Sequence, residues 1–257
     1  MPEIDFLSAL ERECATMQQN LVEADLSAPV LTCPGWSIHD LVVHTGFVHR
    51  HKTAAVRDGY ADLMPGNPGD PGDDLVEWFS EGVAEMLDVF ENADLSVPTW
   101  TWCDHDHVAA WWVRRMAHET LIHGVDLALA VGVSPKVDEL LAQDGISEVL
   151  DEYILGAPKW AHPTVGGGIV ALISPRETWV VTQTEWSGTS PNSKKAYRDE
   201  VGLEYADSGA RPGVSLEASA VDIDLWLWGR LDSRPGTVVG DESLLDYVRS
   251  VALVATQ

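Results

Sequence analysis

The chain has 257 residues, of which 45% are apolar and 22% charged, a composition typical of a globular protein with a sizeable core. It carries 41 acidic and only 16 basic residues, which gives a formal net charge of −25. This balance argues against binding to nucleic acid or to anionic membrane surfaces, because both need clustered positive charge.

The cysteines and the N-terminal segment indicate a cytoplasmic protein. Cys14, Cys33 and Cys103 are widely spaced and form no CxxC motif, so a disulfide framework is not expected. The opening MPEIDFLSAL lacks the basic region and the long apolar run of a signal peptide. No segment approaches the roughly 18–20 apolar residues that span a bilayer. We therefore expect a chain in the reducing cytoplasm, and the sequence leaves its oligomeric state open.

The first half of the chain has the hydrophobic periodicity of helices. Apolar residues recur at spacings of three and four over residues 7–21, and a similar stripe covers residues 75–90. Another helix is predicted to begin near Ser37, where Asp40 completes a capping box. A fourth is predicted from about His107 to Val131. Four such helices with connections of roughly 10–20 residues predict a four-helix bundle.

The residue pattern changes near Gly156. A fifth helix, around residues 138–155, is expected to bridge to the second half, and APKWAHPTVGGG after it has the composition of a linker. We therefore expect an α+β fold class, with a helical bundle in residues 1–157 and a smaller α+β domain in residues 158–257.

The second domain is predicted to contain short strands and two helices. GIVALIS and TWVVTQT are β-branched runs joined by PRE, which predicts a hairpin, and the polar stretch 185–200 is predicted to be a loop. A strand, a helix, a short strand and a closing helix are expected next, at GVSLEAS, AVDIDLWLWGRL, GTVVG and DESLLDYVRSVAL.

The segment RRMAHETLIHGVD contains His118, Glu119 and His123. It is similar to the HExxH helix of zinc proteases, but its second histidine comes one residue too late. Helical residues four apart share a face, whereas His118 and His123, five apart, point about 140° away from each other. Glu119 and His123 are therefore the pair that can bind one ion.

A Glu–His pair alone is also typical of an ordinary helix surface. Here the helix includes Trp111, Trp112 and Ile122, and isolated charges on so apolar a helix would be costly unless they were paired or bound to a metal. His44, on the expected buried face of the second helix, is the best candidate for a third ligand, and a hydrogen-bonded core histidine is the alternative. Two histidines and a glutamate with a fourth position open are the usual catalytic zinc arrangement, although other divalent ions fit these donors.

The remaining histidines of the first half are weaker candidates. His39, His49 and His51 lie in polar sequence and are expected to be solvated. His105 and His107, in CDHDH, leave open a second site in a loop or at a helix start.

Two segments, CPGWSIHDLVVHTG and RRMAHETLIHGVDLALAVG, together resemble the mycothiol-dependent maleylpyruvate isomerase family of actinobacteria, which belongs to the DinB-like metal-binding four-helix bundles. LWLWGR and VVGDESLLDYV resemble its C-terminal α+β domain, so the resemblance covers nearly the whole chain. It implies a divalent metal, most often zinc, bound by His44, Glu119 and His123. It also implies an active-site arginine at Arg230, for which the alternative is a cation interacting with a helix dipole.

The resemblance also implies a reaction. The thiol of mycothiol would lose its proton at the metal and add to the cis double bond of maleylpyruvate, and elimination after rotation would leave fumarylpyruvate. Arg230 would stabilise the developing charge. A mycothiol S-transferase and a non-catalytic metal-binding or interaction protein are alternatives. Apart from Arg114 and Arg115, few basic residues lie near the motifs, which weighs against a dianionic substrate.

Overall fold

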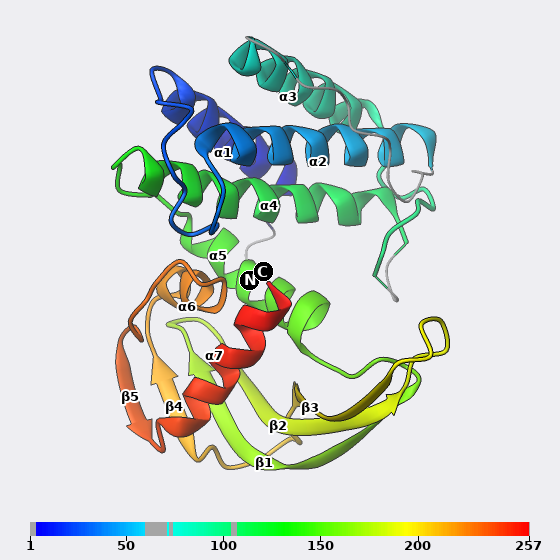
Figure 1. Cartoon of the computed structure of the whole chain (residues 1–257), viewed down its shortest axis with the longest axis vertical. Helices are drawn as coiled ribbons and strands as arrows, with labels where there is room; N and C mark the ends of the chain where they lie inside the picture. Colours follow the sequence, from blue (N-terminus) through cyan, green and yellow to red (C-terminus); the bar gives the residue numbers. More distant parts are fainter. Residues whose placement is uncertain (1–3, 60–70, 72–73, 104–106, 257) are drawn as a thin grey trace. The chain divides into compact units, whose positions relative to one another are not determined.

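The fold is that of a computed structural model, which describes residues 4–59, 71, 74–103 and 107–256 (Figure 1). The chain forms two compact units, Met1–Val137 and Asp138–Gln257. Each is described by itself. The helical first unit and the mixed second unit confirm the predicted α+β class.

The first unit is a bundle of the four predicted helices. They are α1 (Phe6–Leu21), α2 (Ile38–Asp58), α3 (Leu75–Asn92) and α4 (Ala109–Ala130). Helix α1 packs against α4, and α2 packs against both α3 and α4. Large apolar side chains fill the space between the helices, among them Leu10, Met17, Leu41, Phe79, Met86 and Trp112.

Local sequence signals set the ends of the helices that carry the site. Ser37 and Asp40 form the predicted capping box: the Ser37 side chain accepts from the Asp40 amide, and the Asp40 carboxylate accepts from the Ser37 amide. Gly59 ends α2 in the left-handed conformation, with φ of 71°. After α4, Gly132 has φ of 76° and stops the helix where the sequence predicts.

The second unit contains a five-stranded sheet with helices packed on it. In chain order its elements are α5 (Glu139–Glu148), the π-helical turn η1 (Val149–Ile154), β1 (Ala161–Ile173), β2 (Thr178–Thr189), β3 (Ala196–Tyr205), β4 (Val214–Glu217), α6 (Ala220–Leu227), β5 (Thr237–Gly240) and α7 (Ser243–Ala255). The strand order is β3-β2-β1-β4-β5, with β1 and β4 parallel and the other neighbours antiparallel. Helix α7 packs against β1, β3 and β4, and α5 packs against α6.

The predicted hairpin is confirmed, because Ile173 pairs with Thr178 across its turn. The predicted loop at 185–200 is wrong: β2 runs on to Thr189, and β3 begins at Ala196. Most residues of β3 are exposed, so its sequence lacks the apolar alternation that predicts a strand.

The linker expected at 157–168 overlaps the start of β1 at Ala161. Pro163 is tolerated there because this part of β1 has a neighbouring strand, β2, on one side only. On the other side, β4 pairs only with residues 170–173. The boundary between the two compact units lies before α5, between Val137 and Asp138. The domain boundary expected from the residue pattern, at 157/158, lies close to the start of β1.

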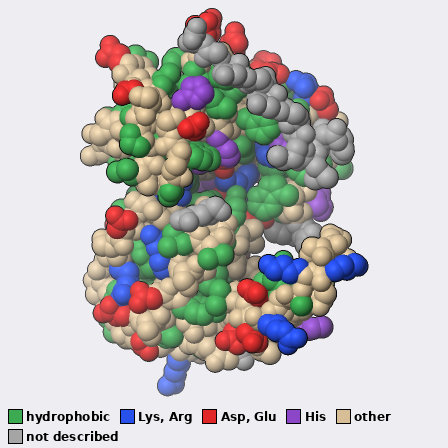
Figure 2. All heavy atoms as spheres, in the orientation of Figure 1, with side chains coloured by type: hydrophobic (Ala, Val, Ile, Leu, Met, Phe, Trp, Pro, Cys, Tyr) green, Lys and Arg blue, Asp and Glu red, His purple; other side chains and the backbone are tan. Residues whose placement is uncertain are grey.

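Acidic side chains are spread over both units in the view of Figure 2, as a net charge of −25 leads one to expect. Within the part of the chain that the structure describes, no helix is both long and apolar enough to cross a membrane. The three cysteines all lie within the described residues, and none of them forms a disulfide.

Candidate metal centre

The side chains of His44, Glu119 and His123 come together between α2 and α4. Glu119 Oε1 lies 3.5 Å from His44 Nε2 and 3.4 Å from His123 Nε2. Glu119 and His123 are one turn apart in α4, as their spacing predicts, and the ring centroid of His44 is 5.1 Å from that of His123. The three donors lie close enough together to hold one metal ion.

The donor spacing suits a tetrahedral ion. Bonds of about 2.0–2.1 Å to nitrogen and oxygen place neighbouring donors of a zinc ion about 3.3–3.4 Å apart. The separations of 3.5 and 3.4 Å around Glu119 Oε1 are close to this value. Three protein donors would leave one position for another ligand. The assignment of His44, Glu119 and His123 as ligands stays a prediction, and the geometry supports it.

Arg115 determines the charge and the orientation of Glu119. Its side chain, 6% exposed, donates a hydrogen bond to Glu119 Oε2, so Oε1 is the oxygen that faces the two histidines. Burial alone would raise the pKa of Glu119, but the charge of Arg115 and hydrogen bonds from His123 and His44 hold this pKa well below its usual range. The carboxylate is therefore ionised and able to bind a cation.

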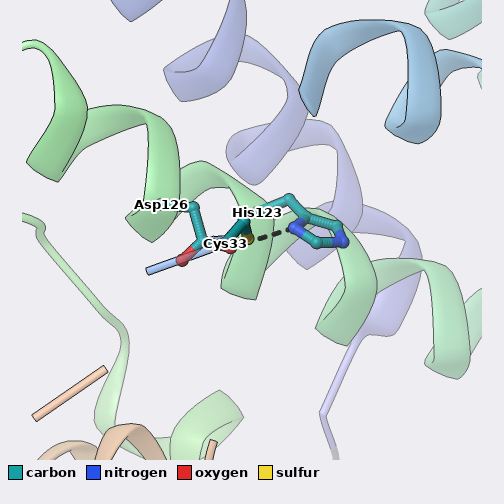
Figure 3. Close-up of side chains that lie close together, drawn as sticks. All are labelled: Cys33, His123 and Asp126. Carbon is teal, nitrogen blue, oxygen red and sulfur yellow. Dashed lines mark hydrogen bonds and ion pairs between the residues drawn. The ribbon is translucent and has the colours of Figure 1, made fainter. Parts of the chain in front are cut away.

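His123 has a different partner on each side of its ring. Its Nδ1 lies 3.0 Å from Asp126 Oδ2, and Cys33 Sγ is 3.4 Å from the same oxygen (Figure 3). Burial disfavours the charged ring, yet hydrogen bonds to Asp126, Cys33 and Glu119 raise the pKa of His123 well above its usual value. A cation at Nε2 would compete with a proton at that nitrogen.

The CPGW segment forms a loop that places Trp36 beside the candidate metal ligands. A β-bridge between Pro29 and Ser37 closes the loop, and turn hydrogen bonds link Val30 with Cys33 and Cys33 with Trp36. The loop places the Trp36 ring 4.9 Å from that of His44 and 6.2 Å from that of His123. We expected His44 on the buried face of α2, and this is wrong: its side chain is 39% exposed, so His44 lies at the edge of that face.

The expectation that His49 and His51 are solvated is wrong. His49 is fully buried, its Nε2 lies 2.8 Å from Thr120 Oγ1, and burial lowers its pKa to about 4. His51 is 8% exposed and packs on Trp100. His49 continues the inward stripe of α2 four residues after Thr45, so helical spacing was the signal that could have found it. His39, with a side chain 40% exposed, is partly solvated.

His118 is buried against Phe6 and does not join the donor set, in agreement with its spacing from His123. His105 lies outside the described residues. His107 Nδ1 is 3.0 Å from Thr101 Oγ1.

Arg230 belongs to the second unit, where it follows α6. Its guanidinium donates to the carbonyl of Trp228. A role for Arg230 in the reaction therefore stays a prediction.

Lys52 is a cation near the site that sequence reasoning missed. Its ammonium lies 4.3 Å from the centroid of the Trp112 ring and 3.0 Å from His51 Nδ1. Burial lowers the pKa of Lys52 to about 8, although the charge of Glu119 partly opposes this shift. The polar sequence around Lys52 gives no sign of this burial, because the two tryptophans that cover it come from distant segments.

Comparison with known proteins gives a family for the bundle. Residues 7–128 match the model described as the mycothiol maleylpyruvate isomerase N-terminal domain. No curated protein matches the sequence. Two similar solved structures are crystal structures of the mycothiol-dependent maleylpyruvate isomerase and of a histidine-to-alanine mutant of it. Each is 16% identical with a TM-score of 0.57. The alignments cover 90% of both chains for the former, and 88% of this chain and 89% of that one for the mutant. At this identity they establish the fold alone.

Proposed function

Residues 7–128 belong to the mycothiol maleylpyruvate isomerase N-terminal domain family, and from this premise we propose that the chain is a divalent-metal enzyme that uses mycothiol. The observation that carries the proposal is the donor triangle, in which Glu119 Oε1 lies 3.5 and 3.4 Å from two histidine nitrogens. A bundle kept only for contact with a partner protein would need no such triangle.

His44, Glu119 and His123 would hold the metal, and zinc suits two imidazoles and a carboxylate. A divalent ion bound there supplies a position at which a thiol ligand loses its proton at neutral pH. Arg115 keeps Glu119 ionised and leaves Oε1 facing the histidines. The ring of Trp36 lies beside the two imidazole rings, 4.9 Å from that of His44 and 6.2 Å from that of His123.

The reaction that we propose is thiol addition to an electrophilic double bond, as in the cis–trans isomerisation of maleylpyruvate to fumarylpyruvate. The thiol supplies the nucleophile when bound and is released again after rotation about the former double bond. Arg230 is proposed to bind a substrate carboxylate and to stabilise negative charge on the carbonyl oxygen that accepts the electron pair.

Conjugation without elimination, which would make the protein a mycothiol S-transferase, is the second candidate. The ion pair between Arg115 and Glu119 favours this candidate, because it leaves the Arg115 guanidinium unable to bind a dianionic substrate. Among the described residues of the first unit, Lys52 is another cation near Glu119.

The test is an incubation of the metal-loaded protein with mycothiol and maleylpyruvate, followed by NMR and mass spectrometry. Isomerisation that needs both mycothiol and His44 supports the first candidate. An accumulating mycothiol adduct of an electrophile supports the second. A protein that binds metal but converts none of these compounds would contradict both candidates and favour a metal-binding interaction protein.

Arg230→Ala tests the role of the second unit. We expect a large loss of turnover with unchanged metal content, because Arg230 is proposed to bind the substrate and not the metal. Arg211→Ala, an exposed arginine of the same unit, is the control. Unchanged kinetics of the Arg230 variant would remove this residue from the site.

A further inference from the structure

Asp126 is a fully buried carboxylate beside the donor triangle. It lies one turn after His123 in α4, and Cys33 reaches it from the CPGW loop, 93 residues earlier in the chain. Both His123 Nδ1, at 3.0 Å, and Cys33 Sγ, at 3.4 Å, approach the same oxygen, Oδ2 (Figure 3). The proposed function gives Asp126 and Cys33 no role.

The chemistry of these groups determines which atoms donate the hydrogen bonds. An ionised carboxylate only accepts hydrogen bonds, and burying it is costly unless donors surround it. The proton therefore belongs on Nδ1 of His123, and the thiol of Cys33 supplies another. With the proton kept on Nδ1, displacement of the Nε2 proton by a metal leaves a neutral ring whose lone pair is on Nε2, the nitrogen that lies 3.4 Å from Glu119 Oε1.

We propose that Asp126 is a positioning residue, which holds the imidazole of His123 with its Nε2 lone pair toward the metal position, and that Cys33 fixes the Asp126 carboxylate. The inference rests on the proposed metal site and deepens it. Carboxylates that hold a metal-binding histidine in this way typically contribute 10–100-fold to metal affinity.

A competing possibility is that Cys33, His123 and Asp126 themselves hold a metal, since their donor atoms also lie close together. Two observations favour positioning. The separation of 3.0 Å between Nδ1 and Oδ2 is a hydrogen-bond distance, shorter than the roughly 3.3–3.4 Å between donors of a tetrahedral ion. A neutral imidazole also offers one lone pair, so His123 can serve only one of the two donor sets.

The test compares zinc affinity, measured by competition with a chromogenic chelator, in the full-length protein and its variants. Asp126→Ala should bind zinc 10–100-fold more weakly, and Asp126→Asn, which keeps the shape and an acceptor oxygen, should lie in between. Cys33→Ala should lose less than Asp126→Ala, and Cys33→Ser, which keeps a donor, should recover part of that loss. Cys14→Ala, at a buried cysteine of α1, is the control and should leave affinity unchanged.

The cobalt-substituted protein distinguishes the outcomes. Positioning predicts one cobalt per chain without the sulfur-to-cobalt charge-transfer band of a thiolate ligand, and a different ligand-field spectrum in Asp126→Asn. A charge-transfer band that disappears in Cys33→Ala would overturn the inference in favour of a thiolate site. Unchanged affinity in both Asp126 variants would overturn it while leaving the metal site intact. No metal in the wild-type protein would refute the proposed function and the inference with it.

Discussion

Glu119 is the residue on which the charged groups of the bundle converge. One carboxylate oxygen accepts from Arg115, and the other faces His44 and His123. A buried carboxylate shared in this way needs positive charge around it, and Arg115 supplies that charge when no metal is bound. Charge balance at this residue therefore couples the stability of the bundle to metal binding.

Arg115→Met should lower the free energy of unfolding of the metal-free protein by about 3 kcal/mol, because it leaves a buried carboxylate without its cation. Saturating zinc should recover part of this loss, since the ion restores positive charge beside Glu119. Urea unfolding with and without zinc measures both effects.

Arg57→Met is the matched control for this experiment. Arg57 pairs with Glu85 at 2.9 Å, but both side chains are about half exposed, so its removal should cost at most about 1 kcal/mol. Equal losses in the two variants would contradict the account of Glu119.

At the scale of elements, the helices of the bundle could be predicted because each has an apolar stripe and clear end signals. Ser37, Asp40 and Gly132 are examples of such signals. The strands at 185–200 could not be predicted in this way, because their stability comes from backbone pairing between exposed segments.

The residues of the candidate site also divide into those that the sequence could predict and those that it could not. Spacing within one helix selects Glu119 and His123, and the motif adds His44. Cys33 could not be assigned a role, because its contact with Asp126 joins residues 93 positions apart. Asp126 lies one turn after His123 in the same helix, so helical spacing was the signal that could have found it.

Helix α6 contains a buried carboxyl group that the second unit must keep uncharged. Asp224 packs against Gly145 of α5, where an added Cβ would lie 2.8 Å from its Oδ2. Burial, followed by the nearby charges of Glu148 and Asp144, raises the pKa of Asp224 well above its usual value. Folding therefore favours the protonated acid, whereas the unfolded chain ionises above about pH 3.9.

Asp224→Asn should stabilise the protein at neutral pH. The wild type loses stability as pH rises from about 4 toward the raised pKa of Asp224, and an amide cannot ionise, so the advantage of the variant should grow over this range. Thermal unfolding at several pH values measures the difference. Asp207→Asn, at an exposed aspartate of the same unit, should show no such trend. A pH-independent difference would mean that Asp224 is ionised in the folded protein.

At the scale of the whole molecule, the two units carry separable parts of the proposed function. His44, Glu119 and His123 all lie in the first unit, and Arg230 lies in the second. Metal binding should therefore be a property of the bundle, while turnover should require residues of both units. The surplus of 41 acidic over 16 basic residues makes a partly buried cation such as Lys52 important for any anionic substrate.

Removal of the metal should therefore destabilise one unit selectively. A ligand present at about 100 times its dissociation constant stabilises the folded state by about 2.7 kcal/mol, and a chelator would remove this contribution. Hydrogen exchange followed by mass spectrometry should show faster exchange in α2 and α4 after chelation and unchanged exchange in β1 and β2. Equal acceleration in both units would contradict the placement of the metal in the bundle.

The most direct test of the central claim is the metal content of the purified protein, measured by elemental analysis for the wild type and for His44→Ala, Glu119→Gln and His123→Ala. The account predicts about one divalent ion per wild-type chain, and its loss in each variant while the bundle stays folded. His39→Ala, on the same helix with a side chain 40% exposed, should keep the ion. Stoichiometric metal in the His44, Glu119 or His123 variants, or a wild-type protein that binds no divalent ion, would contradict the account.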